Sequence, residues 1–99
     1  MLILAGTIRI ADGKRAAALA PIQRMVEATR TEAGCLAYAL SFDALDEHLV
    51  RIFEVFTDEA ALAAHRASSH MAAWRAVMPE LGISDRDIAQ YDVASARKI

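Results

Sequence analysis

The chain has 99 residues, of which 56% are hydrophobic and 24% are charged, so its length fits one domain and its composition excludes a disordered chain. Eleven Lys and Arg against thirteen Asp and Glu give a net charge of −2, and the basic residues are scattered, which argues against nucleic acid as a partner. No apolar run approaches the roughly 20 residues of a membrane helix, so no membrane partner is expected.

The N-terminal residues indicate the compartment. They lack the basic segment of a signal peptide, and Arg9 and Asp12 interrupt the apolar stretch early. The single cysteine, Cys35, cannot form an internal disulfide, which is consistent with a reducing compartment. The sequence therefore predicts one cytoplasmic domain over residues 1–99.

The first part of the chain alternates between strand and helix spacing. Residues 2–10 are apolar on both faces, which predicts a strand covered from two sides. Residues 14–30 have the spacing of a helix, and Pro21 predicts either a kink or a regular helix that starts near it. The expected buried face of that helix contains Leu19, Ile22, Met25, Val26 and Thr29. Residues 35–43 then predict a second strand, with Leu36, Tyr38, Leu40 and Phe42 on one side.

The second part repeats the pattern after a polar hairpin loop. Residues 48–57 predict a third strand, and Thr57 is a plausible N-cap of a helix that runs through Arg66. Ser68 and Ser69 break this helix, and either could cap a further one from residue 70 to about 80. Residues 85 to about 95 predict the last strand.

This βαββαβ order predicts an α+β, ferredoxin-like fold with a four-stranded antiparallel sheet. Right-handed crossovers place both helical connections on the same face of the sheet. Because the strands are apolar on both faces, the open face should be covered by a second copy of the chain. We therefore expect a homodimer that packs sheet against sheet.

The residues that could carry chemistry gather in the second part of the chain. The four glycines are isolated and no histidine has a zinc-ligand spacing, so neither a cofactor nor a metal is expected. His70 and Trp74 are one helical turn apart, and they could meet Glu54, Tyr38 and His65 between helices and sheet. A histidine beside a carboxylate can act as a general base at neutral pH, and aromatic side chains can hold a flat substrate.

Structural interpretations of the same residues remain open. Trp74 with Met71 and Met78 is typical of a packed core, and His65 near a helix end can compensate the helix dipole. Glu54 is harder to explain in this way, because a carboxylate among apolar strand residues needs a partner. Cys35 is interpreted as a small buried filler.

Three segments of the chain together resemble the antibiotic biosynthesis monooxygenase family. They are Glu32–Tyr38, Phe53–His65, and Ser69–Met71 with Trp74. The resemblance covers nearly the whole chain and keeps order and spacing. It specifies the family and not the reaction, since members range over quinol and polyketide oxygenases, haem-degrading enzymes and isomerases of small sugar-derived signals.

The resemblance implies a dimeric α+β barrel with a pocket between the helices and the sheet. The family's pocket positions would fall on Tyr38, Glu54, His65, His70 and Trp74. The chain contains no asparagine, whereas the polyketide oxygenases and haem-degrading members rely on one in the pocket. Thr7 on the first strand is the nearest polar substitute.

The leading hypothesis is a cofactor-independent monooxygenase that acts on a small phenol-type or quinol-type aromatic substrate. His65 or His70 would remove the phenolic proton, assisted by Glu54, and Tyr38 and Trp74 would pack on the ring. The substrate itself would supply the electrons to dioxygen, and the protein would supply positioning. One alternative is an isomerase that moves a proton on a small carbonyl compound. Another is a non-catalytic dimer that binds a small molecule.

Overall fold

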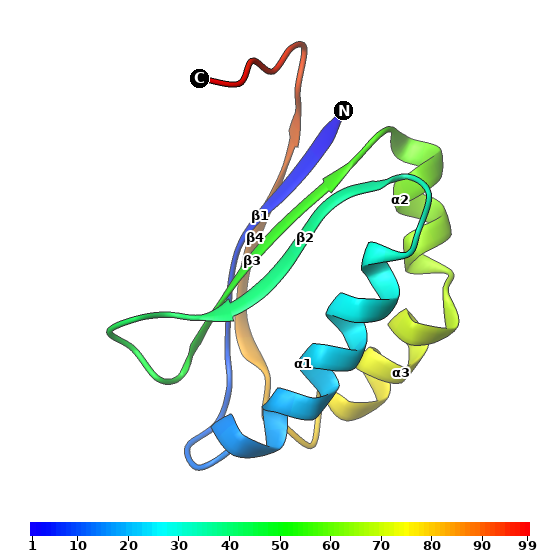
Figure 1. Cartoon of the computed structure of the whole chain (residues 1–99). Coiled ribbons are helices and arrows are strands. Elements are labelled where there is room, and N and C mark those ends of the chain that lie inside the picture. The colour runs from blue at the N-terminus through cyan, green and yellow to red at the C-terminus, as the bar shows by residue number, and fades with distance from the viewer.

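The computed structural model describes residues 1–99 as a four-stranded antiparallel sheet with three helices on one face (Figure 1). The elements are β1 (Leu2–Arg9), α1 (Arg15–Arg30), β2 (Cys35–Phe42), β3 (Leu49–Phe56), α2 (Glu59–Arg66), α3 (Ser69–Val77) and β4 (Ser84–Asp92). The strand order is β2-β3-β1-β4, and every neighbouring pair is antiparallel. The predicted ferredoxin-like α+β fold is therefore confirmed.

The hydrophobic core lies between the helices and the sheet. Alternate residues of the two central strands point into it, and they are Leu2, Leu4 and Ile8 of β1 and Val50, Ile52 and Phe56 of β3. Helix α1 covers them with Ala18, Ile22 and Met25, which are spaced at one helical turn. Burial of this apolar surface is the main favourable contribution to folding.

Helix α1 differs from the prediction in two respects. It begins at Arg15 and continues through Pro21, so a helix that starts near the proline is wrong. Ile22, Met25 and Thr29 are buried as expected, but Leu19 is 47% exposed and Ala18 is buried in its place. The alanine-rich first turns gave the hydrophobic pattern too little contrast to fix the face.

The ends of several elements also shift. Asp58, and not Thr57, caps α2, because the Asp58 side chain accepts a 2.8 Å hydrogen bond from the Ala61 amide. Ser68 caps α3 in the same way. Leu36 was expected beside Tyr38, but it is 57% exposed because the register of β2 shifts between Cys35 and Ala37.

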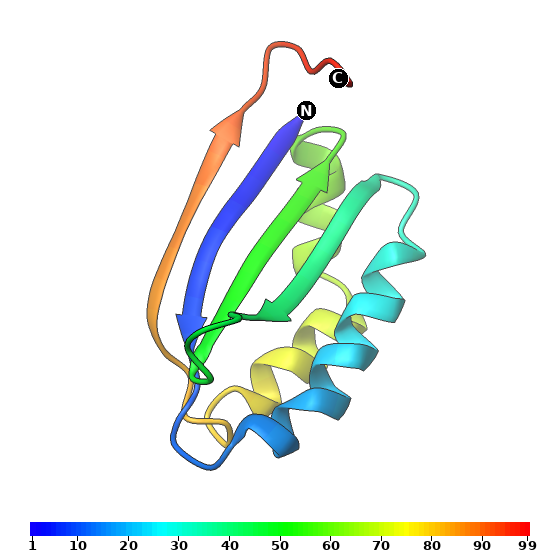
Figure 2. The same cartoon turned by 60° about the vertical axis from the view of Figure 1, so that its left-hand side comes forward.

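The second face of the sheet carries no helix, as the turned view shows (Figure 2). Phe53 of β3 and Tyr91 of β4 lie on this face and are 45% and 53% exposed. Ile3 of β1, which pairs with Tyr91 across the sheet, is half-buried. No helix of the chain is long and apolar enough to cross a membrane.

Candidate active site

A cavity of about 290 Å³ lies between α3 and the helix-covered face of the sheet. Apolar side chains form most of its wall, and Tyr38, Glu54, Trp74, Arg75 and Arg86 are the aromatic and charged residues that line it. The arginines are exposed, whereas the carboxylate and both aromatic residues are buried. The cavity is therefore mainly apolar with a few polar groups, which is the usual composition of a small-molecule site.

Glu54 is the one carboxyl group of the cavity wall. The register of the sheet places it between Tyr38 on β2 and Leu4 on β1, all facing the helices. Only 8% of its surface is exposed. Loss of hydration on burial raises the pKa of the Glu54 carboxyl to about 7, although the positive charges of Arg66 and Arg86 act in the opposite direction. Such a carboxyl can both accept and release a proton near neutral pH.

His65 lies next to Glu54 on the buried side of α2. It is 2% exposed, and its Nε2 atom lies 3.8 Å from Oε1 of Glu54. The Tyr38 and Phe56 rings flank the imidazole, with centroids 5.5 and 5.0 Å away. Its Nδ1 atom lies 2.9 Å from Oε2 of Glu32. The ring is thus held between two carboxylates, one in the cavity and one outside it.

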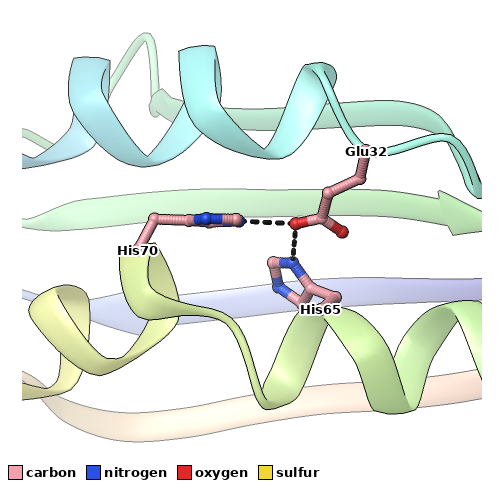
Figure 3. Close-up of side chains that lie close together, drawn as sticks. All are labelled: Glu32, His65 and His70. Atoms are coloured by element: carbon pink, nitrogen blue, oxygen red, sulfur yellow. Dashed lines mark hydrogen bonds and ion pairs between the residues drawn. The ribbon is translucent and has the colours of Figure 1, made fainter.

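Glu32 also binds His70, so one carboxylate oxygen serves two imidazoles (Figure 3). Nε2 of His70 lies 2.5 Å from the same Oε2 atom that contacts His65. The two imidazoles come from adjacent helices, which meet at Ser68. The Ser68 hydroxyl donates to the His65 carbonyl at 2.6 Å and accepts from the Met71 amide. The short break between α2 and α3 therefore brings the two histidines together.

The turn before β2 places Glu32 next to α2. The backbone amide of Thr57 donates to the Gly34 carbonyl at 2.9 Å, which joins this turn to the end of β3. A Cβ atom at Gly34 would collide with the Ala61 side chain of α2. Glycine at this position permits the close approach, and the Glu32 side chain then reaches His65.

The structure brings most of the predicted site residues together, but only some of them line the cavity. Tyr38, Glu54 and Trp74 line it, and His65 and His70 do not. Thr7 lies on the opposite face of the sheet, where it pairs with Arg51 and Asp87. Because successive residues of a strand point to opposite faces, Thr7 does not reach the cavity and does not replace a pocket asparagine.

Sequence reasoning missed three residues of the site, which are Glu32, Arg75 and Arg86. The hairpin register pairs Cys35 with Phe56, so residues just before β2 and just after β3 must meet at one end of the sheet. This register was a signal for Glu32. Arg86 lies two positions before Ile88 on β4, so strand alternation alone could have placed it on the helix-covered face together with Ile88.

Two further groups near the site have raised pKa values. Burial raises the pKa of the Tyr38 phenol, and the Glu54 and Glu32 carboxylates add to the shift. Tyr38 is therefore protonated at neutral pH and can donate a hydrogen bond. Burial also raises the pKa of the Cys35 thiol, which keeps it in the poorly nucleophilic thiol form.

Comparison with known proteins assigns the family. The sequence model of the antibiotic biosynthesis monooxygenase family matches residues 1–77. The chain belongs to the antibiotic biosynthesis monooxygenase family. The matched residues include β1 through α3, and therefore most of the cavity wall, whereas the monooxygenase family model does not extend to β4 and Arg86.

Two solved structures and one further protein sequence are similar to this chain over nearly its whole length. A Deinococcus radiodurans protein described as a candidate antibiotic biosynthesis monooxygenase is 26% identical, with a TM-score of 0.89 over 100% of this chain and 98% of that one. The protein PA3566 of Pseudomonas aeruginosa is 34% identical, with a TM-score of 0.84 over 94% of each chain. The uncharacterized protein sll1783 of Synechocystis sp. is 26% identical over 99% of this chain and 67% of its own length.

Proposed function

We propose that this protein is a cofactor-independent monooxygenase that binds a small phenol-type or quinol-type aromatic molecule in the cavity beneath α3. The observation that carries the proposal is the position of Glu54, a buried carboxyl that faces a cavity walled by Tyr38 and Trp74. Family membership and neighbours described as monooxygenases add support for the type of reaction. The two aromatic side chains fit a flat substrate ring.

Glu54 takes the part of general base in this proposal, in place of the two histidines. Neither His65 nor His70 lines the cavity, whereas Glu54 does. His65 acts through Glu54 as a positioning residue, because its Nε2 atom lies 3.8 Å from the Glu54 carboxylate. The exposed guanidinium groups of Arg75 and Arg86 supply positive charge for a substrate anion.

The proposed reaction balances without an added reductant. Glu54 accepts the hydroxyl proton of the substrate, and the electron-rich ring carbon of the resulting anion reduces dioxygen and forms a carbon–oxygen bond. Glu54 then returns its proton to the peroxide oxygen, and loss of the hydrogen on that ring carbon with cleavage of the O–O bond gives a quinone and water. One phenol and one dioxygen become one quinone and one water, so the substrate is the electron donor. The protein contributes orientation, charge stabilisation and a base.

The test is oxygen consumption with a panel of dihydroxynaphthalenes and hydroquinones, in the presence of a chelator and without added flavin. Glu54→Gln should lower the rate by about 10²- to 10⁴-fold, the usual contribution of a general base. Glu27→Gln, the same chemical change on the exposed side of α1, should retain the rate. Equal rates for Glu54→Gln and the unaltered protein would overturn the assignment of the base.

An anaerobic assay separates the proposal from the alternatives. A monooxygenase stops without dioxygen, while an isomerase that moves a proton with the same Glu54 continues. A binding protein would show thermal stabilisation by the aromatic compounds with no product in either atmosphere. Either of these last two results would contradict the oxygenase proposal.

We also propose that the protein forms a homodimer through the open face of the sheet. Phe53 and Tyr91 expose large apolar side chains on this face, and no element of the chain covers them. Sedimentation analysis should show a dimer that Phe53→Asp converts to a monomer. Leu19→Asp on α1, at a similar 47% exposure, should leave the dimer intact. A folded monomer at micromolar concentration in the unaltered protein would contradict the proposal.

A further inference from the structure

We propose that Glu32, His65 and His70 form a binding site for a divalent transition-metal ion of the zinc class. The three residues come from the turn before β2, from α2 and from the start of α3 (Figure 3). The site is distinct from the cavity wall, which none of the three lines. It also departs from the expectation, based on spacing along the chain, that no metal is bound.

The chemistry of the three donors selects the kind of ion. Two imidazole nitrogens and one carboxylate oxygen suit Zn²⁺, Co²⁺, Ni²⁺ and Cu²⁺, whereas Mg²⁺ and Ca²⁺ prefer oxygen ligands throughout. Three protein ligands leave one position of a tetrahedral ion for water. A negative carboxylate with two imidazoles also compensates part of the charge of the ion.

The donor atoms are already close to the required geometry. Oε2 of Glu32, Nδ1 of His65 and Nε2 of His70 all lie within 4.8 Å of one another. A tetrahedral ion with bonds of about 2.1 Å needs donors roughly 3.4 Å apart. The two nitrogens lie up to 4.8 Å apart, so the imidazoles must approach each other by up to about 1.4 Å. The carboxylate oxygen, at 2.9 and 2.5 Å from the two nitrogens, must withdraw by about 1 Å or less. Glu32 is half-buried in a turn, and rotation about its side-chain bonds provides this movement.

The second nitrogen of His65 faces a carboxylate, as the second nitrogen of a metal-bound histidine commonly does. Its Nδ1 atom faces Glu32 and its Nε2 atom faces Glu54 at 3.8 Å. Metal-bound histidines commonly direct their second nitrogen to a carboxylate, which fixes the ring and strengthens the ligand. His65 is 2% exposed, so its orientation is set before an ion arrives.

The surroundings of His70 provide access for an ion. Its side chain is 21% exposed and lines a second cavity, of about 180 Å³, between α1 and α3. This cavity has room for the water that completes the coordination. The ion would tie together the turn before β2, α2 and α3, so its main effect is on the stability of the helical layer, and it reaches the proposed oxygenase step only through His65 and Glu54.

The experiment is calorimetric titration of the protein, free of any histidine tag and freed of metal by a chelator, with Zn²⁺. We expect one ion per chain and a rise in Tm of roughly 10 °C at a free Zn²⁺ concentration about 100 times the dissociation constant. Co²⁺ should give visible absorption bands of a nitrogen and oxygen site, without thiolate charge transfer. The proposal would be overturned if the titration showed several ions per chain in place of one, or if Zn²⁺ gave no rise in Tm.

Variants locate the ion. Glu32→Gln and His70→Gln, both at partly exposed positions, should abolish the one-site binding. Glu54→Gln should weaken it by roughly 10- to 100-fold, as expected for an outer-sphere partner. His48→Gln, at the histidine outside the cluster, and Cys35→Ala should bind as the unaltered protein does. Unchanged binding in Glu32→Gln and His70→Gln, or its loss in His48→Gln, would contradict the assignment. None of these readouts requires oxygenase activity.

Discussion

The two helical connections of the sheet differ in a way that explains where the polar groups lie. The first is a single helix, α1, whose buried residues are Ala18, Ile22, Met25 and Thr29, none of them ionisable. The second is divided into α2 and α3, and its buried residues are Leu62, His65 and Trp74. The divided connection has a junction between α2 and α3, and its helix α3 lines two cavities, one against the sheet and one against α1. We expect the first connection to serve stability and the second to serve chemistry.

Ile22→Ala tests whether α1 serves stability, and it should have the largest effect on the free energy of unfolding. The side chain is 6% exposed on α1 and lines neither of the cavities that flank Trp74. Its truncation should lower the free energy of unfolding by about 3 kcal/mol, measured by urea denaturation. The affinity for an aromatic ligand should stay the same. A loss below about 1 kcal/mol would mean that α1 is not the packed half of the helical layer.

Trp74→Ala tests the second connection, which contains α2 and α3. The indole is buried, but it lines both cavities, so it packs against fewer atoms than a fully enclosed ring. We expect a loss of about 2 kcal/mol in urea denaturation, below the roughly 3–5 kcal/mol of a fully packed aromatic residue. Binding of dihydroxynaphthalenes, followed by thermal shift, should disappear. Retained binding would remove Trp74 from the ligand site.

Glu54 should make the stability of the protein depend on pH. Its folded pKa is about 7 and its usual value is 4.5, so between these values the folded state holds a proton that the unfolded state has released. Stability should therefore be greatest below pH 4.5 as far as this group is concerned, and should fall as the pH rises through 7.

The variant Glu54→Gln isolates this effect. In chelator-treated protein it should be more stable than the unaltered chain at pH 8, by on the order of 1 to 2 kcal/mol, with little difference at pH 5. A difference that does not change between these two pH values would contradict the raised pKa. The matched change Glu27→Gln, on exposed α1 surface, should show no such pH dependence.

Ser68→Ala should have the smallest effect on stability, and it tests the role of the junction between α2 and α3. The hydroxyl accepts from the Met71 amide and donates to the His65 carbonyl, so its loss should cost about 1 kcal/mol in thermal unfolding. Asp58→Ala removes the cap of α2 alone and should cost a similar amount. Only Ser68→Ala should alter the NMR signals of the His70 imidazole. Identical spectra for the two variants would show that the junction does not position the histidine.

The fold could be predicted almost entirely from the sequence, because period-2 and helical patterns alternate clearly along the chain. The faces of β1 and β3 and the division between α2 and α3 follow directly from apolar spacing and from the serine pair at 68–69. The buried face of α1 was predicted correctly at Ile22, Met25 and Thr29, but Leu19 was chosen in place of Ala18 because a run of alanines does not show which position faces the core. The N-cap shifted from Thr57 to Asp58, since both residue types cap helices and only the backbone geometry decides.

The candidate site was predictable in its residue types and not in its geometry. Tyr38, Glu54 and Trp74 were placed together correctly, but the direction of the two histidines depends on how α2 meets α3. Thr7 was assigned from chemistry alone, and its position in the strand puts it on the other face. Glu32 was missed because its partners are 33 and 38 positions away along the chain.

Gly34 makes the turn before β2 sensitive to substitution. Because Gly34 has no side chain, the Ala61 side chain of α2 can pack directly against it. A methyl group added there would push the turn outward and carry the Glu32 carboxylate away from both imidazoles at once. A substitution far from the cavity, and without charge or reactivity of its own, would thus separate three segments of the chain and release the ring that supports Glu54.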